Sequence, residues 1–529
     1  MTNKYVALEG GLDLVTPTLE ASPGKCVTAL NCYESVKGGY VSIAGYERFD
    51  GQPSPAESGS LEDADALRDL IDPVPGDGPI RGVAQILGQV LAWRNSGPAS
   101  VCYRSTDDGW VEVTNSEGTV GYSTAALTDT TISYINHNFY GGKDTYRMYI
   151  GDGVNPAQEY DPVLHTLTLA ADSGPVGFVA AFNERLIMSS TGGTFLASVS
   201  GDPLNLDGTL NAVEIGVGDE ITGFAVTASD NLAIYTIRTT WGLTGTGPLA
   251  DSAGQAAWRL QMISQNAGAK PHCIAQTDDV FASDNRGIGV LSRTEKLGGF
   301  SSSTITDEIQ PLFKRISADA TCATTIRSSN QMRFYYGNTG LVASQVEFNA
   351  NGNTGIRYGM TETFYPEKVL CVSTEEDLEG SELSFFGSES GYVYQMDKGR
   401  SFDGKDIELN VTLQFNHFKS PSVNKRFMGL SLEALLMEPT DFDVDYIMND
   451  GTRSFEYRTA NFEDGSSVWG SSEFGSALFG ARPLSRDKVS LKGTGYNLQL
   501  TFSRDSSTSA QAVLTGYTIR YTERGQTAL

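Results

Sequence analysis

The sequence is poor in basic residues and in histidine. It carries 38 Lys and Arg against 64 Asp and Glu, a formal net charge of −26, and only 4 His in 529 residues. Charged residues make up only 19% of the chain, so the acidity reflects a shortage of cations and not a highly charged composition. A protein whose main task is to hold DNA by its phosphates needs a basic surface, and the acidic composition argues against that class.

Long apolar runs and a cysteine framework are also missing. No stretch approaches the roughly 18 consecutive apolar residues of a transmembrane helix, and polar residues interrupt Met1–Gly11 where a signal peptide would have its apolar core. We therefore expect no membrane insertion by this chain and no secretion. The cysteines are too widely spaced for a disulfide framework, and we expect free, buried thiols in a reducing compartment: Cys26, Cys32, Cys102, Cys273, Cys322 and Cys371.

The common catalytic patterns do not occur. The histidines stand far apart, and the chain has no HExxH motif, no phosphate-binding loop and no GxGxxG that opens a helix. Gly387–Gly391 carries Glu where a GxSxG motif has its nucleophile, and it has the composition of a hairpin turn. Carboxylates are so numerous that no single pair marks a glycosidase. The sequence therefore predicts no enzyme, no catalytic residue and no cofactor.

Two weaker patterns have ordinary explanations. Ser105–Trp110 resembles part of the Asp-box turn of sialidase propellers, but its Trp follows the Gly at once and the pattern occurs only once. Asp441, Asp443, Asp445 and Asp450 could offer oxygens to Ca²⁺, but they lack the order of a calcium loop. The first three alternate along one predicted strand. We expect a simple turn, a solvated strand face and no metal.

The chain is rich in glycine and aromatics, with 58 Gly, 24 Phe and 23 Tyr, which is typical of many short strands and tight turns. One local unit recurs, in which an apolar run, a turn of Gly, Asn or Asp and a second apolar run form a β-hairpin. These units predict an all-β fold with an irregular β-propeller of six or seven blades. Two or three unrelated sandwiches are the alternative. The units are Gly82–Arg94, Met148–Tyr160, Val179–Met188, Phe224–Leu243, Ile274–Leu291, Met332–Phe348 and Leu383–Met396.

The two ends of the chain differ from this middle. Strict alternation in segments such as Asp406–Phe415 and Val513–Tyr521 predicts strands with one buried and one solvated face. We expect residues 405–529 to form an antiparallel β-sandwich platform domain, joined by N-terminal strands in residues 1–50. Residues 81–404 form the propeller. Residues 51–80 are an exposed, acidic, Pro-, Ser- and Gly-rich excursion with one helix candidate, Leu61–Ile71.

A Gly-rich aromatic loop, Val468–Phe479, lies between the strands of the predicted sandwich. Trp469, Phe474 and Phe479 fall at intervals of five residues, each beside a Gly. Exposed aromatics on a flexible loop suit a surface that buries against a partner. These three residues are the candidate interface with a neighbouring subunit or an adaptor. The alternative is a loop that folds over the edge of its own sandwich.

Several segments together resemble the tail nozzle, or tail tubular, proteins of short-tailed bacteriophages and the related propeller proteins that plug phage portals. Leu30–Phe49 is similar to their opening segment, in which a Gly-Gly turn precedes a strand that ends in Gly-x-x-Arg-Phe. Asn231–Gly245 resembles a blade strand, and Asn266–Ser292 has a Gly turn, a strand and an Asp-x-Arg-Gly hairpin in the same order, followed by a short helix candidate in Ile305–Phe313. Gly391–Gly404 and then Phe418–Phe427 resemble the exit into the platform.

The resemblance implies a structural virion protein of the phage tail that is assembled in the host bacterial cytoplasm. It implies a homo-oligomer, a hexameric tube below a dodecameric adaptor, with the portal complex and tail fibres or tailspikes as partners. The genome would be retained by this tube and would leave through it without specific binding. An acidic wall repels DNA and avoids the counterion release that traps a strand.

A carbohydrate-binding or carbohydrate-cleaving propeller is the competing class. Such a protein would also be all-β and rich in glycine and aromatics. The missing signal peptide and the missing repeat of a sugar-binding motif count against it. The two classes differ in whether a glycan raises the melting temperature of the protein.

Overall fold

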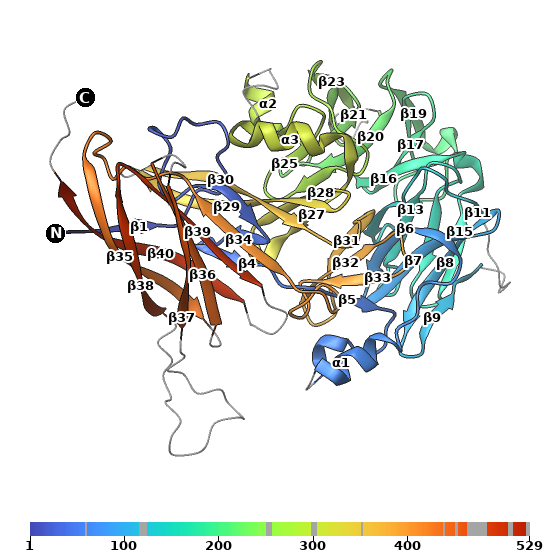
Figure 1. Cartoon of the computed structure of the whole chain (residues 1–529). Helices are drawn as coiled ribbons and strands as arrows, with labels where there is room; N and C mark the ends of the chain where they lie inside the picture. Colours follow the sequence, from blue (N-terminus) through green and yellow to red (C-terminus); the bar gives the residue numbers. More distant parts are fainter. Residues whose placement is uncertain are drawn as a thin grey trace.

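The computed structural model describes residues 1–58, 61–115, 124–249, 257–297, 304–350, 353–436, 440–449, 453–462, 484–505 and 511–524. Figure 1 shows a broad β-sandwich at the N- and C-terminal end of the molecule and a disc of smaller sheets beside it. Among the described helices, none has the length and apolarity needed to cross a bilayer.

Seven groups of antiparallel strands follow one another along the described middle of the chain and form the blades of a propeller. Blade 1 consists of β6 (Asp77–Ile86), β7 (Gln89–Ser96), β8 (Ala99–Thr106) and β9 (Gly109–Glu112). Blade 2 consists of β12 (Ser133–His137), β13 (Arg147–Gly151), β14 (Gln158–Asp161) and β15 (Thr166–Leu169). Blade 3 consists of β16 (Val176–Phe182), β17 (Arg185–Ser190), β18 (Thr194–Ala197) and β19 (Val213–Gly216). Blades 4 and 5 consist of β20 (Ile221–Val226), β21 (Leu232–Thr236), β22 (Thr240–Thr244) and β23 (Arg259–Ser264); and β24 (Ile274–Gln276), β25 (Val280–Ser283) and β26 (Ile288–Val290). Blades 6 and 7 consist of β27 (Ala320–Ile326), β28 (Gln331–Tyr336), β29 (Thr339–Ala350) and β30 (Asn353–Phe364); and β31 (Cys371–Glu376), β32 (Glu382–Gly387), β33 (Val393–Met396) and β5 (Tyr46–Phe49).

The first strands of the seven blades close a ring. Each of them contacts the first strand of the next blade, from β6 through β12, β16, β20, β24 and β27 to β31, and β31 packs back against β6. Each hairpin unit predicted from the sequence falls in a different blade. The predicted all-β propeller is therefore confirmed with seven blades, and the alternative of unrelated sandwiches is excluded.

The platform is a sandwich of two sheets. Sheet A contains β1 (Thr2–Ala7), β3 (Cys32–Glu34), β4 (Tyr40–Ser42), β35 (Asn424–Leu436), β38 (Leu484–Gly495) and β40 (Ala512–Arg524). Sheet B adds β2 (Cys26–Leu30), β34 (Glu408–Leu413), β36 (Thr440–Met448), β37 (Arg453–Phe462) and β39 (Leu498–Asp505) to the strands of blade 6. One apolar core lies between the sheets, because alternate residues of each strand face inward; it includes Leu430, Phe442, Phe502 and Ile519.

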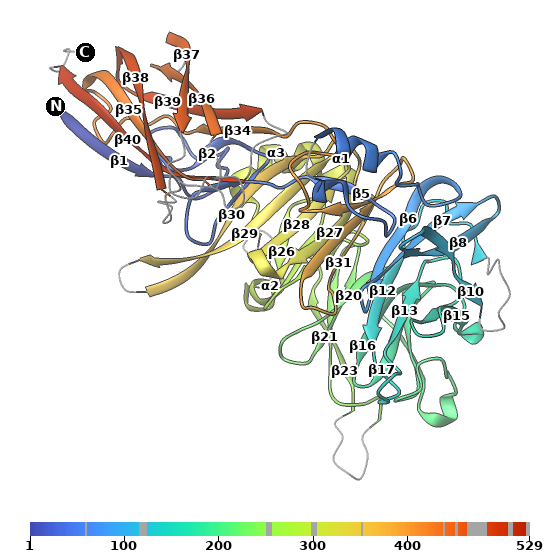
Figure 2. The ribbon, with the colours of Figure 1, turned by 90° about the horizontal axis from the view of Figure 1, so that it is seen from below.

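Blade 6 joins the propeller to the platform. Sheet B runs in the order β27-β28-β29-β30-β2-β34-β39-β36-β37, and Leu30 of β2 pairs in parallel with Glu362 of β30. The hairpin of β29 and β30 is longer than those of the other blades, and its end projects away from the disc (Figure 2). One continuous sheet therefore fixes the orientation of the propeller on the platform.

Two features of the N-terminal region differ from the sequence-based boundaries. Residues 1–50 were assigned to the platform, but β5 pairs with β33 and forms the outer strand of blade 7. Residues 51–80 were expected to be an exposed excursion, but β6 already begins at Asp77, and Ile71 and Val74 are buried. A pairing between residues about 350 apart leaves no local trace in the sequence, so propensity and turn signals do not reveal it.

The remaining elements are short. The helix candidate in residues 61–71 is α1 (Leu61–Arg68), and the candidate in residues 305–313 becomes a 3-10 turn, Asp307–Ile309, followed by α3 (Gln310–Ile316). Ile309 and Leu312 of that segment are buried. The others are β10 (Thr114–Asn115), β11 (Thr124–Ala125), α2 (Leu291–Leu297) and 3-10 turns at Pro55–Glu57, Ala171–Ser173, Gly208–Leu210, Ser317–Asp319 and Arg327–Ser329.

Candidate functional site

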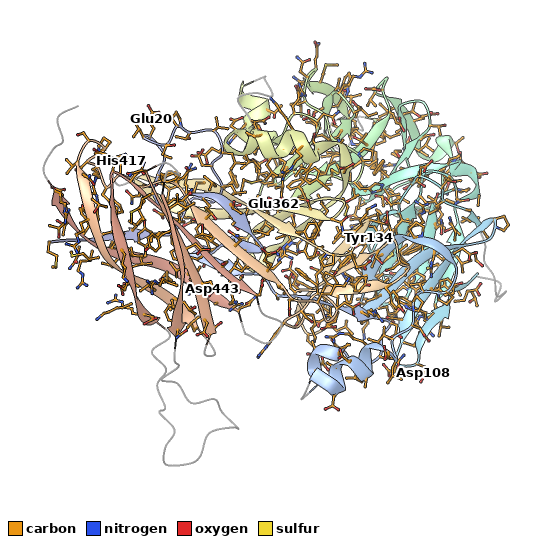
Figure 3. All side chains as sticks on the ribbon, viewed as in Figure 1. Glu20, Asp108, Tyr134, Glu362, His417 and Asp443 are labelled. Atoms are coloured by element: carbon orange, nitrogen blue, oxygen red, sulfur yellow. The ribbon has the colours of Figure 1, made fainter. Side chains whose placement is uncertain are left out.

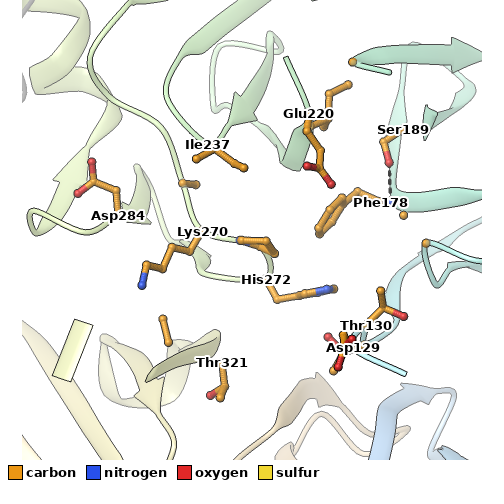
Figure 4. A pocket seen from close by; sticks show the side chains of 18 of the residues that line it. Asp129, Thr130, Phe178, Ser189, Glu220, Ile237, Lys270, His272, Asp284 and Thr321 are labelled. Atoms are coloured by element: carbon orange, nitrogen blue, oxygen red, sulfur yellow. Dashed lines mark hydrogen bonds between the residues drawn. The ribbon is translucent and has the colours of Figure 1, made fainter. Parts of the chain in front are cut away.

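A large cavity lies on the axis of the propeller. Its volume is about 1380 Å³, more than the ~300–1,000 Å³ of ordinary ligand pockets, and all seven blades contribute to its wall. The wall is made of inner strands and of the loops that lead into them. One residue from each blade, in chain order, is Arg81, Asp129, Phe178, Glu220, Lys270, Thr321 and Leu370; several of them are seen around the space in Figure 4.

Phe178 and His272 narrow the axis to a waist. Both residues line the large cavity and also a second cavity of about 300 Å³, whose wall includes Tyr134 and Thr222. Their ring centroids are 4.9 Å apart, and Figure 4 shows the two side chains facing each other. His272 adopts a left-handed backbone conformation with φ of 58°, and its carbonyl accepts a hydrogen bond from the amide of Ala323 at 2.9 Å. The waist is therefore held by the fold.

Two of the carboxylates in the cavity wall are used by the fold itself. Asp152 is buried and accepts hydrogen bonds from the amides of Val154 and Asn155 at 2.9 and 2.7 Å and from the side chain of Gln158 at 3.1 Å. Asp284 accepts two hydrogen bonds from the guanidinium of Arg286, at 2.9 and 2.6 Å. The carboxylates of Asp152 and Asp284 thus hold their own loops in shape, and few of their hydrogen-bonding positions remain for a ligand.

Other charged groups face the cavity without such partners. Within the described parts of the chain, Asp129, Glu220, Arg81 and Arg238 form no ion pair, and the Nε atom of Arg81 is buried without a hydrogen bond. Lys270 donates to the carbonyl of Ser317, and burial lowers the pKa of its ammonium. The cavity thus offers charges of both signs, in contrast to the strong negative charge of the whole chain.

The structure also shows where the Asp-box-like turn and the aspartate-rich strand lie. Ser105–Trp110 spans the turn between β8 and β9, and Asp441, Asp443 and Asp445 lie along β36, exposed or half-exposed. Figure 3 places Asp108 and Asp443 on separate parts of the molecule, the propeller and the platform. Asp450 lies outside the described residues. Across the described ranges, no group of three or more His, Cys, Asp or Glu could hold a metal ion.

The cysteines are structural. All six are buried and free, as predicted. Burial raises the pKa of Cys273 to about 12 and that of Cys371 to about 12, so these thiols stay protonated at neutral pH.

The aromatic interface candidates are not placed by the structure. Trp469, Phe474 and Phe479 belong to residues 463–483, which lie outside the described residues. The axial cavity, in contrast, was missed by sequence reasoning. Some of its charged residues stand in loops that lead into inner strands, such as Glu220 before β20 and Lys270 before β24, and no periodic pattern marks such positions.

Comparisons with known proteins gave matches at the level of structure alone. No family model matches the chain, and no curated protein matches its sequence. A chain in a crystal structure of a mitotic checkpoint complex superimposes with a TM-score of 0.36 and 13% identity over 61% of this chain and 90% of that one. The Neurospora crassa Pan2 WD40 domain gives a TM-score of 0.35 and 9% identity over 60% of this chain and 89% of that domain.

The half-buried histidine at the waist should make the protein sensitive to acid. Burial lowers the pKa of His272 to about 4, whereas a histidine in an unfolded chain titrates near 6.5. Between these values the unfolded state binds more protons, so stability falls as the pH drops through this window. We expect His272→Gln to lose less stability than the wild type between pH 6.5 and 4, by on the order of 2 kcal/mol in urea unfolding.

The control for this prediction is His417→Gln, which removes a histidine from the platform, far from the axis. The explanation fails if the wild type and His272→Gln show the same pH dependence.

Proposed function

We propose that this chain is a structural subunit of a viral tail, similar to the tail nozzle of short-tailed bacteriophages. Copies of the chain assemble into a ring with an acidic channel, below an adaptor, and the genome passes through the channel. On this proposal the protein belongs to the virion, acts without catalysis, and has the portal–adaptor complex and tail fibres or tailspikes as neighbours.

The observation that carries this proposal is the way in which the platform is built from both ends of the chain. Strands β1, β3 and β4 lie in one sheet with β35, β38 and β40, so the seven-bladed propeller is inserted between the two halves of a sandwich. Three of the segments that resemble the nozzle proteins lie at these junctions. Leu30–Phe49 leads from the platform to β5, and Gly391–Gly404 with Phe418–Phe427 leads from blade 7 back into β35.

The charge of the chain supports the same function. A conduit must not retain its cargo, and each contact between a cation and a phosphate would do so through counterion release. With 64 acidic and 38 basic residues, a ring of such subunits repels DNA.

An acidic ring subunit is not expected to bind DNA. The purified protein should show no measurable binding to double-stranded DNA at physiological salt, whereas basic binders reach ~10⁻⁴–10⁻⁶ M without sequence specificity. Fluorescence anisotropy of a labelled duplex at several salt concentrations is the measurement. Micromolar binding that weakens steeply with added salt would contradict the proposal.

Co-assembly is the test of the proposed function. The purified chain is mixed with portal–adaptor complexes of a short-tailed phage whose nozzle has been removed, and the mixture is separated by size. The proposal expects the chain to bind these complexes as a ring. A chain that remains a monomer, both alone and in the mixture, would contradict it.

The axial cavity supports a second candidate, a propeller that binds or cleaves carbohydrate. Asp129 and Glu220 are carboxylates in its wall, and Phe178 offers an aromatic face to a sugar ring. Thermal melting with a panel of glycans separates this candidate from the first. A specific sugar would raise the melting temperature by mass action, and substitution of Glu220 by Gln would abolish that shift.

A further inference from the structure

The inner strands of four blades carry a β-bulge near their beginning. In β6, β16, β20 and β27, the pairing with the second strand of the blade shifts by one extra residue. The bulge residues that have no partner in the ladder and line the axial cavities are Arg81, Phe178, Thr222 and Thr321. A bulge interrupts the ladder and re-aims a side chain, and bulges are frequent next to active sites. The four bulges therefore turn four side chains toward the axis of the propeller.

Two hydrogen-bond donors in the wall of the large cavity find no acceptor among the described residues. They are the Nε of Arg81 and the hydroxyl of Thr130, and both atoms are buried. The segment that contains Thr130 runs beside Arg81, because the amide of Ile132 donates to the carbonyl of Arg81 at 3.0 Å. A guanidinium binds a carboxylate through two parallel hydrogen bonds, and the hydroxyl would add a third donor. A ligand with a carboxylate would thus supply the acceptors that these buried donors lack.

Other groups in the same wall suit the ring and the hydroxyls of a sugar. The backbone of Phe178 is fixed at its bulge, where its amide donates to the Oγ of Ser189 at 2.8 Å (Figure 4). The ring of Phe178 offers an apolar face against which the CH groups of a sugar ring can pack. Asp129 and Glu220 are exposed in the wall and form no ion pair with the described residues, so they can accept hydrogen bonds from sugar hydroxyls.

The charges of the wall favour a ligand with a single negative group. Cations and carboxylates balance in the wall, whereas the whole chain carries −26. The carboxylates would repel a ligand with several phosphate charges, such as a nucleoside triphosphate, while Arg81 is matched by one carboxylate. The charged residues of the wall are Arg81, Arg238, Lys270 and Arg286 with Asp129, Asp152, Glu220 and Asp284.

We propose that the axial cavity binds an acidic saccharide, with the carboxylate of a uronic acid on Arg81 and Thr130 and the sugar ring against Phe178. This inference goes beyond the proposed ring, which needs no ligand on the propeller axis. It rests on the second candidate function, since it names the class of sugar that the cavity takes.

Calorimetric titration of the full chain with sugars tests this inference. The probes are disaccharides that carry one glucuronic, galacturonic or mannuronic acid. The neutral disaccharides of the same linkage are the matched controls, because each differs from its acidic counterpart only in a hydroxymethyl group in place of the carboxylate. We expect at least one acidic disaccharide to bind about tenfold or more tightly than its neutral counterpart, since hydrogen bonds to a charged group are the stronger ones.

Substitutions in the wall should remove this preference. Arg81→Gln is expected to bind the acidic and the neutral disaccharide with equal affinity. Arg426→Gln makes the same chemical change at an exposed position of β35 in the platform and should bind as the wild type does. Thr130→Val removes the hydroxyl and keeps the shape of the side chain, and it should weaken binding of the acidic disaccharide several-fold. It tests the same site if Arg81→Gln lowers the melting temperature of the free protein.

The outcomes separate this inference from the functions proposed above. If neutral sugars bind as tightly as acidic ones, or if both wall variants keep the wild-type affinity for the acidic sugar, the inference is wrong and the carbohydrate-binding candidate stands. If none of the disaccharides binds, the inference and that candidate both fail. Ring assembly is measured on the protein without sugar and is not affected by either result.

Discussion

Replacing Lys425 by methionine is expected to destabilise the platform by about 3 kcal/mol or more. Lys425 is fully buried, and its Nζ donates three hydrogen bonds to backbone carbonyls, of Ser420 at 2.6 Å, Val423 at 2.8 Å and Tyr496 at 3.0 Å. The carbonyls of Ser420 and Val423 belong to the segment just before β35, and that of Tyr496 belongs to the turn between β38 and β39. Methionine has a similar length but no donor, so it leaves the three carbonyls without these bonds.

Urea unfolding of Lys425→Met against the wild type measures this effect. Lys419→Met makes the same chemical change at an exposed position nearby, and we expect it to change stability by less than about 0.5 kcal/mol. Equal effects of the two substitutions would show that the carbonyls find other donors and that Lys425 does not hold the turn.

Replacing Arg68 by methionine is the second change with a large expected effect. Arg68, at the end of α1, binds Glu47 of β5 with two hydrogen bonds, Nε to Oε2 at 2.8 Å and Nη2 to Oε1 at 2.7 Å. Glu47 is only 1% exposed. Removal of one partner leaves a buried charge without compensation, which costs about 3–5 kcal/mol. Because β5 is the strand that closes blade 7, we expect the propeller to open at lower temperature.

The loss of stability in Arg68→Met should depend on pH. Burial raises the pKa of Glu47 even with Arg68 beside it, and loss of Arg68 raises it further. An acid with a raised pKa in the folded state binds protons there that the unfolded state lacks, so stability falls as the pH rises through that pKa. The melting temperature of Arg68→Met should therefore be closer to that of the wild type at pH 5 than at pH 7.

Glu47→Gln combined with Arg68→Met serves as the control for charge. The double variant should regain part of the stability at pH 7, because the buried group is then neutral. If the loss is the same at both pH values and in the double variant, Arg68 acts by packing alone.

The blades could be predicted from the sequence because a β-hairpin is a local structure. In each predicted unit, a turn of Gly, Asn or Asp separates two apolar runs, and the structure confirms positive φ at such turns, for example Asn183 and Asp230. The alternation in β34, β36 and β39 likewise reports a sheet with one buried face. The hairpin pattern and the alternation along a strand each extend over only about ten residues, so both can be recognised in the sequence.

The closure of the propeller and the axial cavity could not be predicted in this way. β5 pairs with β33 across about 350 residues, and both strands satisfy the same local pattern as any other blade strand. The cavity is assembled from residues of seven blades that lie far apart in the sequence, such as Arg81, Glu220 and Lys270, and none of them carries a local signal of such a site. Only the ring of inner strands brings them together.

Imaging of the purified full-length chain by electron microscopy tests the central proposal most directly. A structural ring subunit should give closed cyclic particles, six-fold by the resemblance to nozzle proteins, with a central channel between subunits and with the platforms in contact. Class averages that show only single particles of a seven-bladed disc with an attached sandwich, at concentrations where tail proteins assemble, would contradict the account.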